Sequence, residues 1–211
     1  MATTTNYGWT TPDNTAYVKD GASAIRTLGS SVDTTLFGIT GGKNVSSATI
    51  YKATLTAQST INLTSIFVSN YTNYQIVLKG TYSGTASGIQ LRMRLGSTDA
   101  IGATDYAQIR ILKEYAAAVT GDAYNTSAWN VIGAIGALGS SNNIQLFNPN
   151  VAIRTTVNSN YVWFSSGMTN GETGMVGGIH NQATAYDGCS ILVPTGTFTG
   201  TIEVIGIRGG I

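Results

Sequence analysis

A repeating apolar stripe marks the first forty residues of the chain. Small or apolar side chains recur at alternating spacings of four and three residues, at Val18, Ala22, Ile25, Gly29, Val32 and Leu36. This spacing is that of a heptad seam and predicts an α-helix over residues 15–37. Asp13 or Asn14 can cap its start, and Gly38 is a plausible stop signal. Gly21 and Gly29 each weaken an isolated helix by about 1 kcal/mol, so this helix needs a packing partner.

The pattern leaves the partner of this helix open. The helix can lie on the β-rich part of its own chain, bundle with copies of itself, or dock on a neighbouring protein. Two aromatic side chains in the polar segment before it favour docking, although a loose terminus is the ordinary interpretation of such a segment. We therefore expect an oligomer or anchor interface that contains Tyr7, Trp9, Val18, Ala22, Ile25, Val32 and Leu36.

After a Gly- and Ser-rich hinge at residues 41–47, the period of the apolar positions changes from that of a helix to that of a strand. Alternation is clearest at 73–82 and 87–96. Separate strands are also expected at 151–157 and 160–168, and within 160–164 the residues alternate so that Tyr161 and Trp163 share a face. Many short segments of this kind, separated by turn signals such as GSTDAIGATD and TNGETG, predict antiparallel strands packed on one core. We expect an all-β fold, with an antiparallel, jelly-roll-like β-sandwich at 48–211 and an N-terminal anchoring arm and helix at 1–40.

Composition limits the classes of protein to consider. Apolar residues make up 42% of the 211-residue chain, which is enough for a core, but charged residues make up only 10%. Ordinary soluble proteins carry roughly 25% charged residues, so this uncharged polar surface suits a protein held in an assembly. The net charge is +1, so the chain lacks the strong excess of basic residues that is typical of a nucleic-acid binder. Since no apolar run is long enough for a membrane span and the N-terminus has no secretory pattern, we expect no membrane insertion.

Residues that carry chemistry are few and scattered. Cys189 is the single cysteine and His180 the single histidine, so neither a disulfide nor a usual zinc site is expected. We expect Cys189 to be a small buried residue, and His180 to pack beside Tyr186 or to bond to backbone. Most acidic residues lie in predicted turns, whose geometry aspartate tolerates. A carboxylate pair for sugar hydrolysis is the weaker alternative, so we expect no enzyme activity, no metal and no cofactor.

Aromatic residues in the second half of the chain suggest a binding surface. Tyr115, Tyr124 and Trp129 flank the polar loop TGDAYNTS. Sugar rings stack on aromatic faces, and loop Asn, Asp and Ser side chains supply hydrogen bonds, so these three form a candidate glycan-binding patch. The alternative is that they are core and cross-strand residues.

The N-terminal run NYGWTTPDNTAYVKDGASAIRTLGSSVDTTL closely resembles a segment that precedes a β-rich body in many tail and other virion structural proteins of tailed bacteriophages. The matching positions are Asn6, Tyr7, Gly8, Trp9, Pro12, Val18, Lys19, Asp20, Gly21, Ala22, Ala24, Ile25, Leu28, Gly29 and Asp33. A looser resemblance covers residues 71–115 and the closing TFTGTIEVIGIRGG, which look like the start and the last strand of a jelly-roll-like domain in such proteins.

The resemblance implies a virion component that is assembled in the host cytoplasm, exposed on the particle, usually oligomeric and often a homotrimer. Such a protein would attach to other virion proteins through residues 1–40 and use its β-sandwich for adsorption to a host-surface glycan, as a short tail fibre or tail-tip protein does. The chain is short for a tail fibre and lacks a long shaft. A capsid decoration, cement or head-fibre protein without a ligand is therefore the alternative.

Overall fold

The structure, a computed structural model, describes residues 2–4, 8–11, 18–40, 46–165, 168 and 170–209. The chain divides into two compact units, Met1–Ser46 and Ser47–Ile211. The predicted helix caps Asp13 and Asn14, and residues 41–45 of the predicted hinge, lie outside the described residues.

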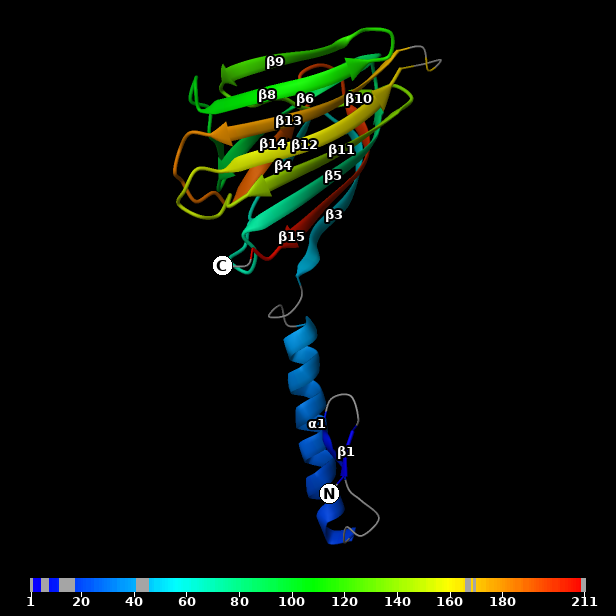
Figure 1. Cartoon of the computed structure of the whole chain (residues 1–211), viewed down its shortest axis with the longest axis vertical. Coiled ribbons are helices and arrows are strands. Elements are labelled where there is room, and N and C mark those ends of the chain that lie inside the picture. The colour runs from blue at the N-terminus through cyan, green and yellow to red at the C-terminus, as the bar shows by residue number, and fades with distance from the viewer. Residues whose placement is uncertain are drawn as a thin grey trace. The chain divides into compact units, whose positions relative to one another are not determined.

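The first unit contains a short ribbon and one long helix (Figure 1). Strand β1 (Ala2–Thr3) pairs antiparallel with β2 (Thr10–Thr11), and α1 runs from Val18 to Thr40. The prediction that the helix stops at Gly38 is wrong, because α1 continues past it. Gly38 keeps helical backbone and does not adopt the left-handed conformation that commonly ends a helix.

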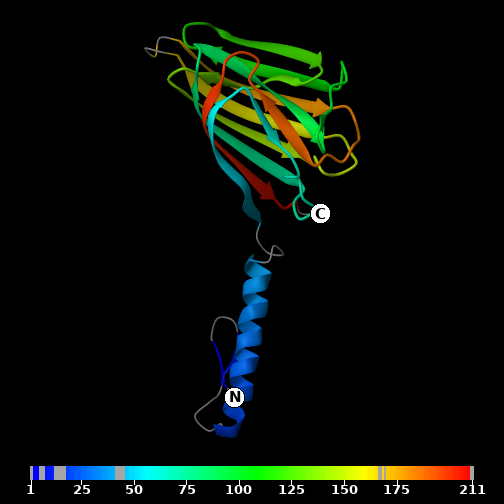
Figure 2. The ribbon, with the colours of Figure 1, turned by 180° about the vertical axis from the view of Figure 1, so that it is seen from behind.

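The second unit is a sandwich of two antiparallel sheets, seen from opposite sides in Figures 1 and 2. The larger sheet has the order β3 (Ser47–Gln58), β15 (Phe198–Ile207), β5 (Asn73–Tyr82), β11 (Gly139–Phe147), β12 (Thr156–Phe164), β13 (Gly171–His180), β8 (Tyr106–Glu114) and β9 (Val119–Thr126). The smaller sheet has the order β10 (Trp129–Gly136), β6 (Ala86–Leu95), β14 (Gly188–Leu192) and β4 (Thr60–Leu63), with β7 (Thr98–Asp99) paired to β6.

The core lies between the two sheets and follows the predicted alternation. On β5 the side chains of Tyr74, Ile76 and Leu78 are fully buried, while the residues between them face outward. Strand β6 buries its apolar side chains at every second position in the same way, at Ile89, Leu91 and Met93, although Leu95 at its end is exposed. The predicted all-β, antiparallel sandwich with an N-terminal arm is therefore confirmed.

Two strands differ from their predicted positions. The sequence VTGDAYNT forms β9, an edge strand that was predicted as loop because it has few apolar residues and contains Gly121 and Asp122. Residues 151–157 were predicted as a separate strand, but the structure has one continuous strand at Thr156–Phe164. The polar residues at its start resemble a turn in sequence, yet Ser159 is buried and its neighbours point outward. Among the described residues, no helix combines the length and hydropathy needed to cross a bilayer.

Candidate functional site

The three aromatic residues of the predicted glycan patch do not share a surface. Trp129 opens β10 and is 0% exposed, with its ring edge-on to Tyr106 at a centroid distance of 5.1 Å. Its indole occupies the space that a side chain on Gly178 would need, since a Cβ there would lie 2.7 Å from Nε1. The prediction of an exposed Trp129 is wrong, and its core alternative is correct, because the side chain lies in the layer between the sheets.

Tyr124 belongs to a charged cluster on the core-facing side of β8, β9, β12 and β13. The guanidinium of Arg110 donates from Nε to Asp122 at 3.1 Å and from Nη1 to Glu172 at 3.2 Å. Tyr124 donates its hydroxyl hydrogen to Asp122 at 3.0 Å, and Tyr161 donates its own to Glu172. Arg110 and Glu172 side chains are only 13% and 11% exposed, so the two carboxylates depend on this one cation.

The ion pair sets the protonation of Asp122. The hydrogen bond from Arg110 is the main reason that the pKa of Asp122 is lowered from 3.8, and the Tyr124 hydroxyl lowers it further. An aspartate in this state is ionised at neutral pH and does not serve as a general acid. The cluster is therefore arranged to hold β9 against β8 and β13 through its charges.

A pH dependence of stability follows from this lowered pKa. The Asp122 carboxyl binds a proton less readily in the folded chain than in the unfolded chain. The stabilisation that its ionised form gives is therefore fully present above the unfolded pKa and is lost as pH falls through the folded pKa. We expect the free energy of unfolding to drop below about pH 4. Urea unfolding at several pH values should show a smaller acid drop in Asp122→Asn than in the parent. An equal drop in both proteins would contradict this role of Asp122.

Tyr115 is the member of the predicted patch that reaches solvent, with 63% of its surface exposed. It follows β8 directly, and its backbone N–H donates to the Gly171 carbonyl at 2.8 Å. This bond places Tyr115 beside the end of β13, where a depression of about 220 Å³ is lined by Lys113, Glu114, Tyr115, Val162, Phe164, Gly171, Glu172 and Thr173. Tyr115 thus lines the same depression as Phe164, an aromatic residue on the outward face of β12.

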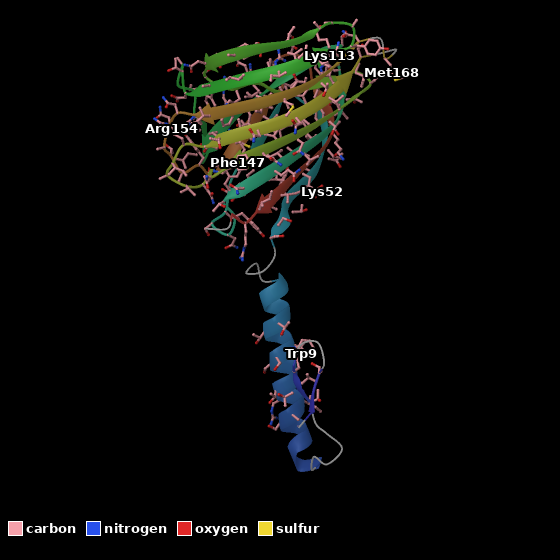
Figure 3. All side chains as sticks on the ribbon, in the orientation of Figure 1. Trp9, Lys52, Lys113, Phe147, Arg154 and Met168 are labelled. Carbon is pink, nitrogen blue, oxygen red and sulfur yellow. The ribbon has the colours of Figure 1, made fainter. Side chains whose placement is uncertain are left out.

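A second depression borders the first across Val162 and Phe164. It has a volume of about 340 Å³ and also contacts Leu138, Gly139, Ser140, Ser141 and Met168. Lys113 and Met168 are labelled at the same end of the body in Figure 3, opposite Arg154. Phe164 therefore stands between two hollows at one end of the larger sheet. This aromatic end of the outer face is the candidate ligand site of the sandwich.

His180 and Cys189 are core residues, as expected. The His180 ring is fully buried and lies edge-on to Tyr186 at a centroid distance of 5.2 Å, and its Nδ1 accepts a hydrogen bond from the Gln182 backbone N–H at 3.3 Å. Burial lowers the pKa of His180 and raises the pKa of the Cys189 thiol, so neutral forms are favoured for both. Within the described ranges no three His, Cys, Asp or Glu side chains gather closely enough to hold a metal ion.

The helix α1 presents part of its apolar stripe to solvent. Ile25 is 67% exposed and Ala22 is exposed as well, whereas Val32 is half-buried. The side chains of Val18 and Leu36 lie outside the described part of the structure, as does Tyr7. The heptad seam therefore contains an uncovered apolar side chain at its centre.

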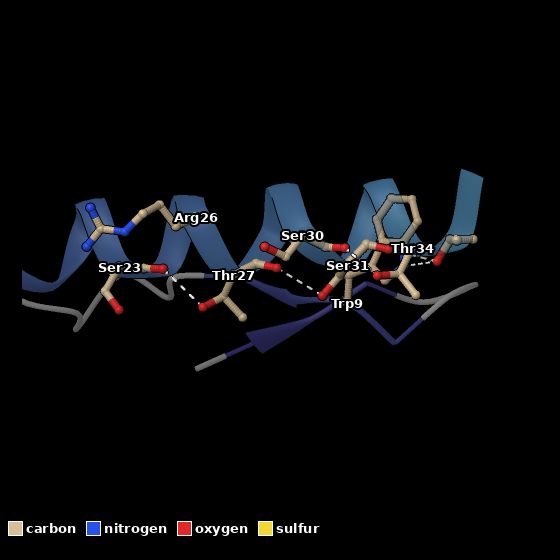
Figure 4. Close-up of a pocket in the computed structure, with 8 residues that line it drawn as sticks. Trp9, Ser23, Arg26, Thr27, Ser30, Ser31 and Thr34 are labelled. Atoms are coloured by element: carbon tan, nitrogen blue, oxygen red, sulfur yellow. Dashed lines mark hydrogen bonds between the residues drawn. The ribbon is translucent and has the colours of Figure 1, made fainter. Parts of the chain in front are cut away.

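The arm packs on a neighbouring face of α1, which Figure 4 shows in close-up. The half-buried Trp9 donates its indole hydrogen to the Thr35 hydroxyl at 3.2 Å. This contact borders a groove of about 610 Å³ lined by Trp9, Ser23, Arg26, Thr27, Ser30, Ser31, Thr34 and Thr35. Several of these hydroxyls bond to helix carbonyls four residues earlier, as Thr27 does to Ser23 at 3.0 Å. The arm therefore lies on a hydroxyl-rich face and leaves Ile25 uncovered.

Comparison of the chain with known protein families, with curated protein sequences and with solved structures gives no match.

Proposed function

We propose that this chain is a non-enzymatic structural protein of a tailed-bacteriophage particle, in the manner of a short tail fibre or tail-tip protein. Residues 1–40 attach it to other particle proteins, α1 joins the copies into a homotrimer, and the sandwich binds a host-surface glycan. The observation that carries the proposal is the exposed Ile25 at the centre of a heptad seam, in a segment that resembles phage anchoring arms.

The seam supports association because Ala22 and Ile25 stay exposed within the described part of their own unit. Burying an Ile side chain contributes about 2 kcal/mol, and a bundle of copies buries one from each chain. The small residues Ala22 and Gly29 beside it let helices approach closely. Association also compensates for the two glycines that weaken α1 as an isolated helix.

The aromatic end of the outer face supports adsorption to a glycan. Tyr115 and Phe164 offer apolar faces for the C–H side of a sugar ring, and the Thr173 hydroxyl and Lys113 ammonium offer hydrogen bonds. The second hollow beyond Phe164 adds Ser140 and Ser141 as further polar groups. The arrangement fits an oligosaccharide with one sugar unit in each hollow and Phe164 between the two units.

A glycan array tests this part of the proposal. Tyr115→Ala and Phe164→Ala are each expected to weaken binding by about tenfold, because each removes one of the two stacking surfaces. Ile153→Ala is the matched control, since Ile153 is an exposed apolar residue in the loop that contains Arg154, at the other end of the body. Equal loss in all three variants would contradict the assignment of the site.

Two other results on the same protein separate this proposal from its alternatives. An array without any bound glycan would favour a capsid decoration or cement role. Turnover of a host polysaccharide that is lost in Asp122→Asn would overturn the non-enzymatic assignment, because it would make the carboxylate a catalytic group.

A further inference from the structure

The two hollows beside Phe164 differ in chemistry. The hollow that Tyr115 lines also contains acidic and basic side chains. No charged residue in the described part of the chain lines the other, which we call the apolar hollow, and its lining residues are Leu138, Gly139, Ser140, Ser141, Val162, Phe164 and Met168. Leu138 is 52% exposed and Met168 66%, so both apolar side chains are available to a ligand. The apolar hollow therefore suits a neutral, partly apolar group.

The shape of the apolar hollow follows from two glycines that flank Phe164. In the register of the sheet, Phe164 on β12 lies between Gly171 on β13 and Gly139 on β11. A Cβ on Gly171 would lie 2.5 Å from the Phe164 Cδ1, so the aromatic ring covers that glycine. A Cβ on Gly139 would meet no atom within 4 Å. The ring thus leans toward β13, and the space over Gly139 stays open.

The apolar hollow offers one free hydroxyl group. The Ser140 hydroxyl donates to the Gly80 carbonyl at 3.1 Å. Ser141 pairs with Val162 in the register, and its hydroxyl has no hydrogen-bond partner among the described residues. Lys79 is the partner of Ser141 on β5, but it does not line the hollow. A ligand group here therefore needs an apolar end and a neutral acceptor for the Ser141 hydroxyl.

We propose that the apolar hollow binds an N-acetylated amino sugar of the host-surface glycan. The acetyl methyl group packs among Leu138, Val162 and Met168, and the acetyl carbonyl accepts a hydrogen bond from the Ser141 hydroxyl. The volume of about 340 Å³ is at the lower end of the range for small-molecule sites, so it suits a single sugar unit with its substituent. This inference rests on the proposed adsorption to a glycan and names the class of sugar that is bound.

Titration calorimetry of the full chain with synthetic trisaccharides tests the inference. Trisaccharides of N-acetylglucosamine and of N-acetylgalactosamine are each compared with the N-formyl derivative, which keeps the amide but lacks the methyl group. One methyl group in an apolar pocket changes affinity by about tenfold. At least one acetylated trisaccharide is therefore expected to bind on the order of tenfold more tightly than its N-formyl derivative.

Two substitutions on either side of Val162 assign this preference to a hollow. Ser141→Leu fills the apolar hollow and removes its free hydroxyl, so it is expected to abolish the preference for acetyl over formyl. Thr173→Leu is the matched comparison, because Thr173 is the partner of Val162 on β13 and lines the hollow of Tyr115 instead. It should weaken the acetylated and formylated sugars alike and keep their ratio. Circular dichroism checks that both variants keep the fold of the parent.

Each outcome supports or overturns the inference. A preference for acetyl that Ser141→Leu removes and Thr173→Leu keeps supports it. Equal binding of the acetyl and formyl forms, or a preference that Ser141→Leu leaves intact, would overturn it without affecting the proposed adsorption. Tighter binding of a rhamnose trisaccharide than of both acetylated ones would also overturn it, and would assign the hollow to the methyl group of a 6-deoxy sugar. Binding of no trisaccharide and of no glycan on the array would contradict the proposed adsorption as well.

Discussion

Replacing Arg110 by Met is expected to lower the free energy of unfolding by about 3 kcal/mol. The substitution keeps the length and apolar stem of the side chain but removes the only cation that contacts Asp122 and Glu172 in the described structure. Glu172 is then left almost buried, beside the Tyr161 hydroxyl, without a compensating charge. Urea unfolding followed by tryptophan fluorescence measures the change, since Trp129 and Trp163 both report on the core.

Arg154→Met is the matched control for this experiment. Arg154 is exposed, and its Nε donates a single hydrogen bond to the Asn181 carbonyl at 3.1 Å. A surface change of this kind alters stability by less than about 0.5 kcal/mol. If Arg110→Met and Arg154→Met were equally stable, the charged cluster would have no structural role.

Ile25→Asp is expected to convert the proposed homotrimer into a monomer. The chain mass is 22.0 kDa, so light scattering should report a fall from three times that value to one at micromolar concentration. The cause is that bundled helices would bring three aspartates together in an apolar seam, where none has a counter-charge.

Thr27→Asp provides the comparison for the seam variant. It adds the same charge to the same helix, two residues away, where Thr27 lines the hydroxyl-rich groove on another face. Thr27→Asp should keep the mass of the parent, and circular dichroism should show similar helix content in both variants. Identical masses for Ile25→Asp, Thr27→Asp and the parent would remove α1 as the element that joins the copies.

The fold was predictable where the apolar pattern has a clear period. Alternation on β5 and β6 identified side chains that are fully buried, because one face of each strand meets the core. The apolar pattern did not predict β9, because a strand at the edge of the sheet needs few apolar side chains. Trp129 was misplaced for a related reason: a tryptophan next to a polar loop in sequence can still be the first residue of a core strand.

The residues of the candidate sites come together through the pairing register of the strands. Local sequence patterns do not show which strands pair, so they could not predict these contacts. Arg110 meets Asp122 because β8 pairs with β9, and it meets Glu172 because β13 lies on the other side of β8. Tyr115 meets Phe164 across β13, from a position far away in sequence. The period of 2 did predict that residues 160–164 alternate, but it left open which face of β12 is the core, and Phe164 proved to lie on the outer face.

The central claim is that this chain is a particle protein attached through its N-terminal unit. Its most direct test is cryo-electron microscopy of purified phage particles assembled with the full chain or with a chain that lacks residues 1–46. We predict density for a trimeric sandwich at a fixed site on particles with the full chain, and no such density on particles with the truncated chain. Particles that hold the truncated sandwich at the same occupancy, or that lack the full-length protein, would contradict the account.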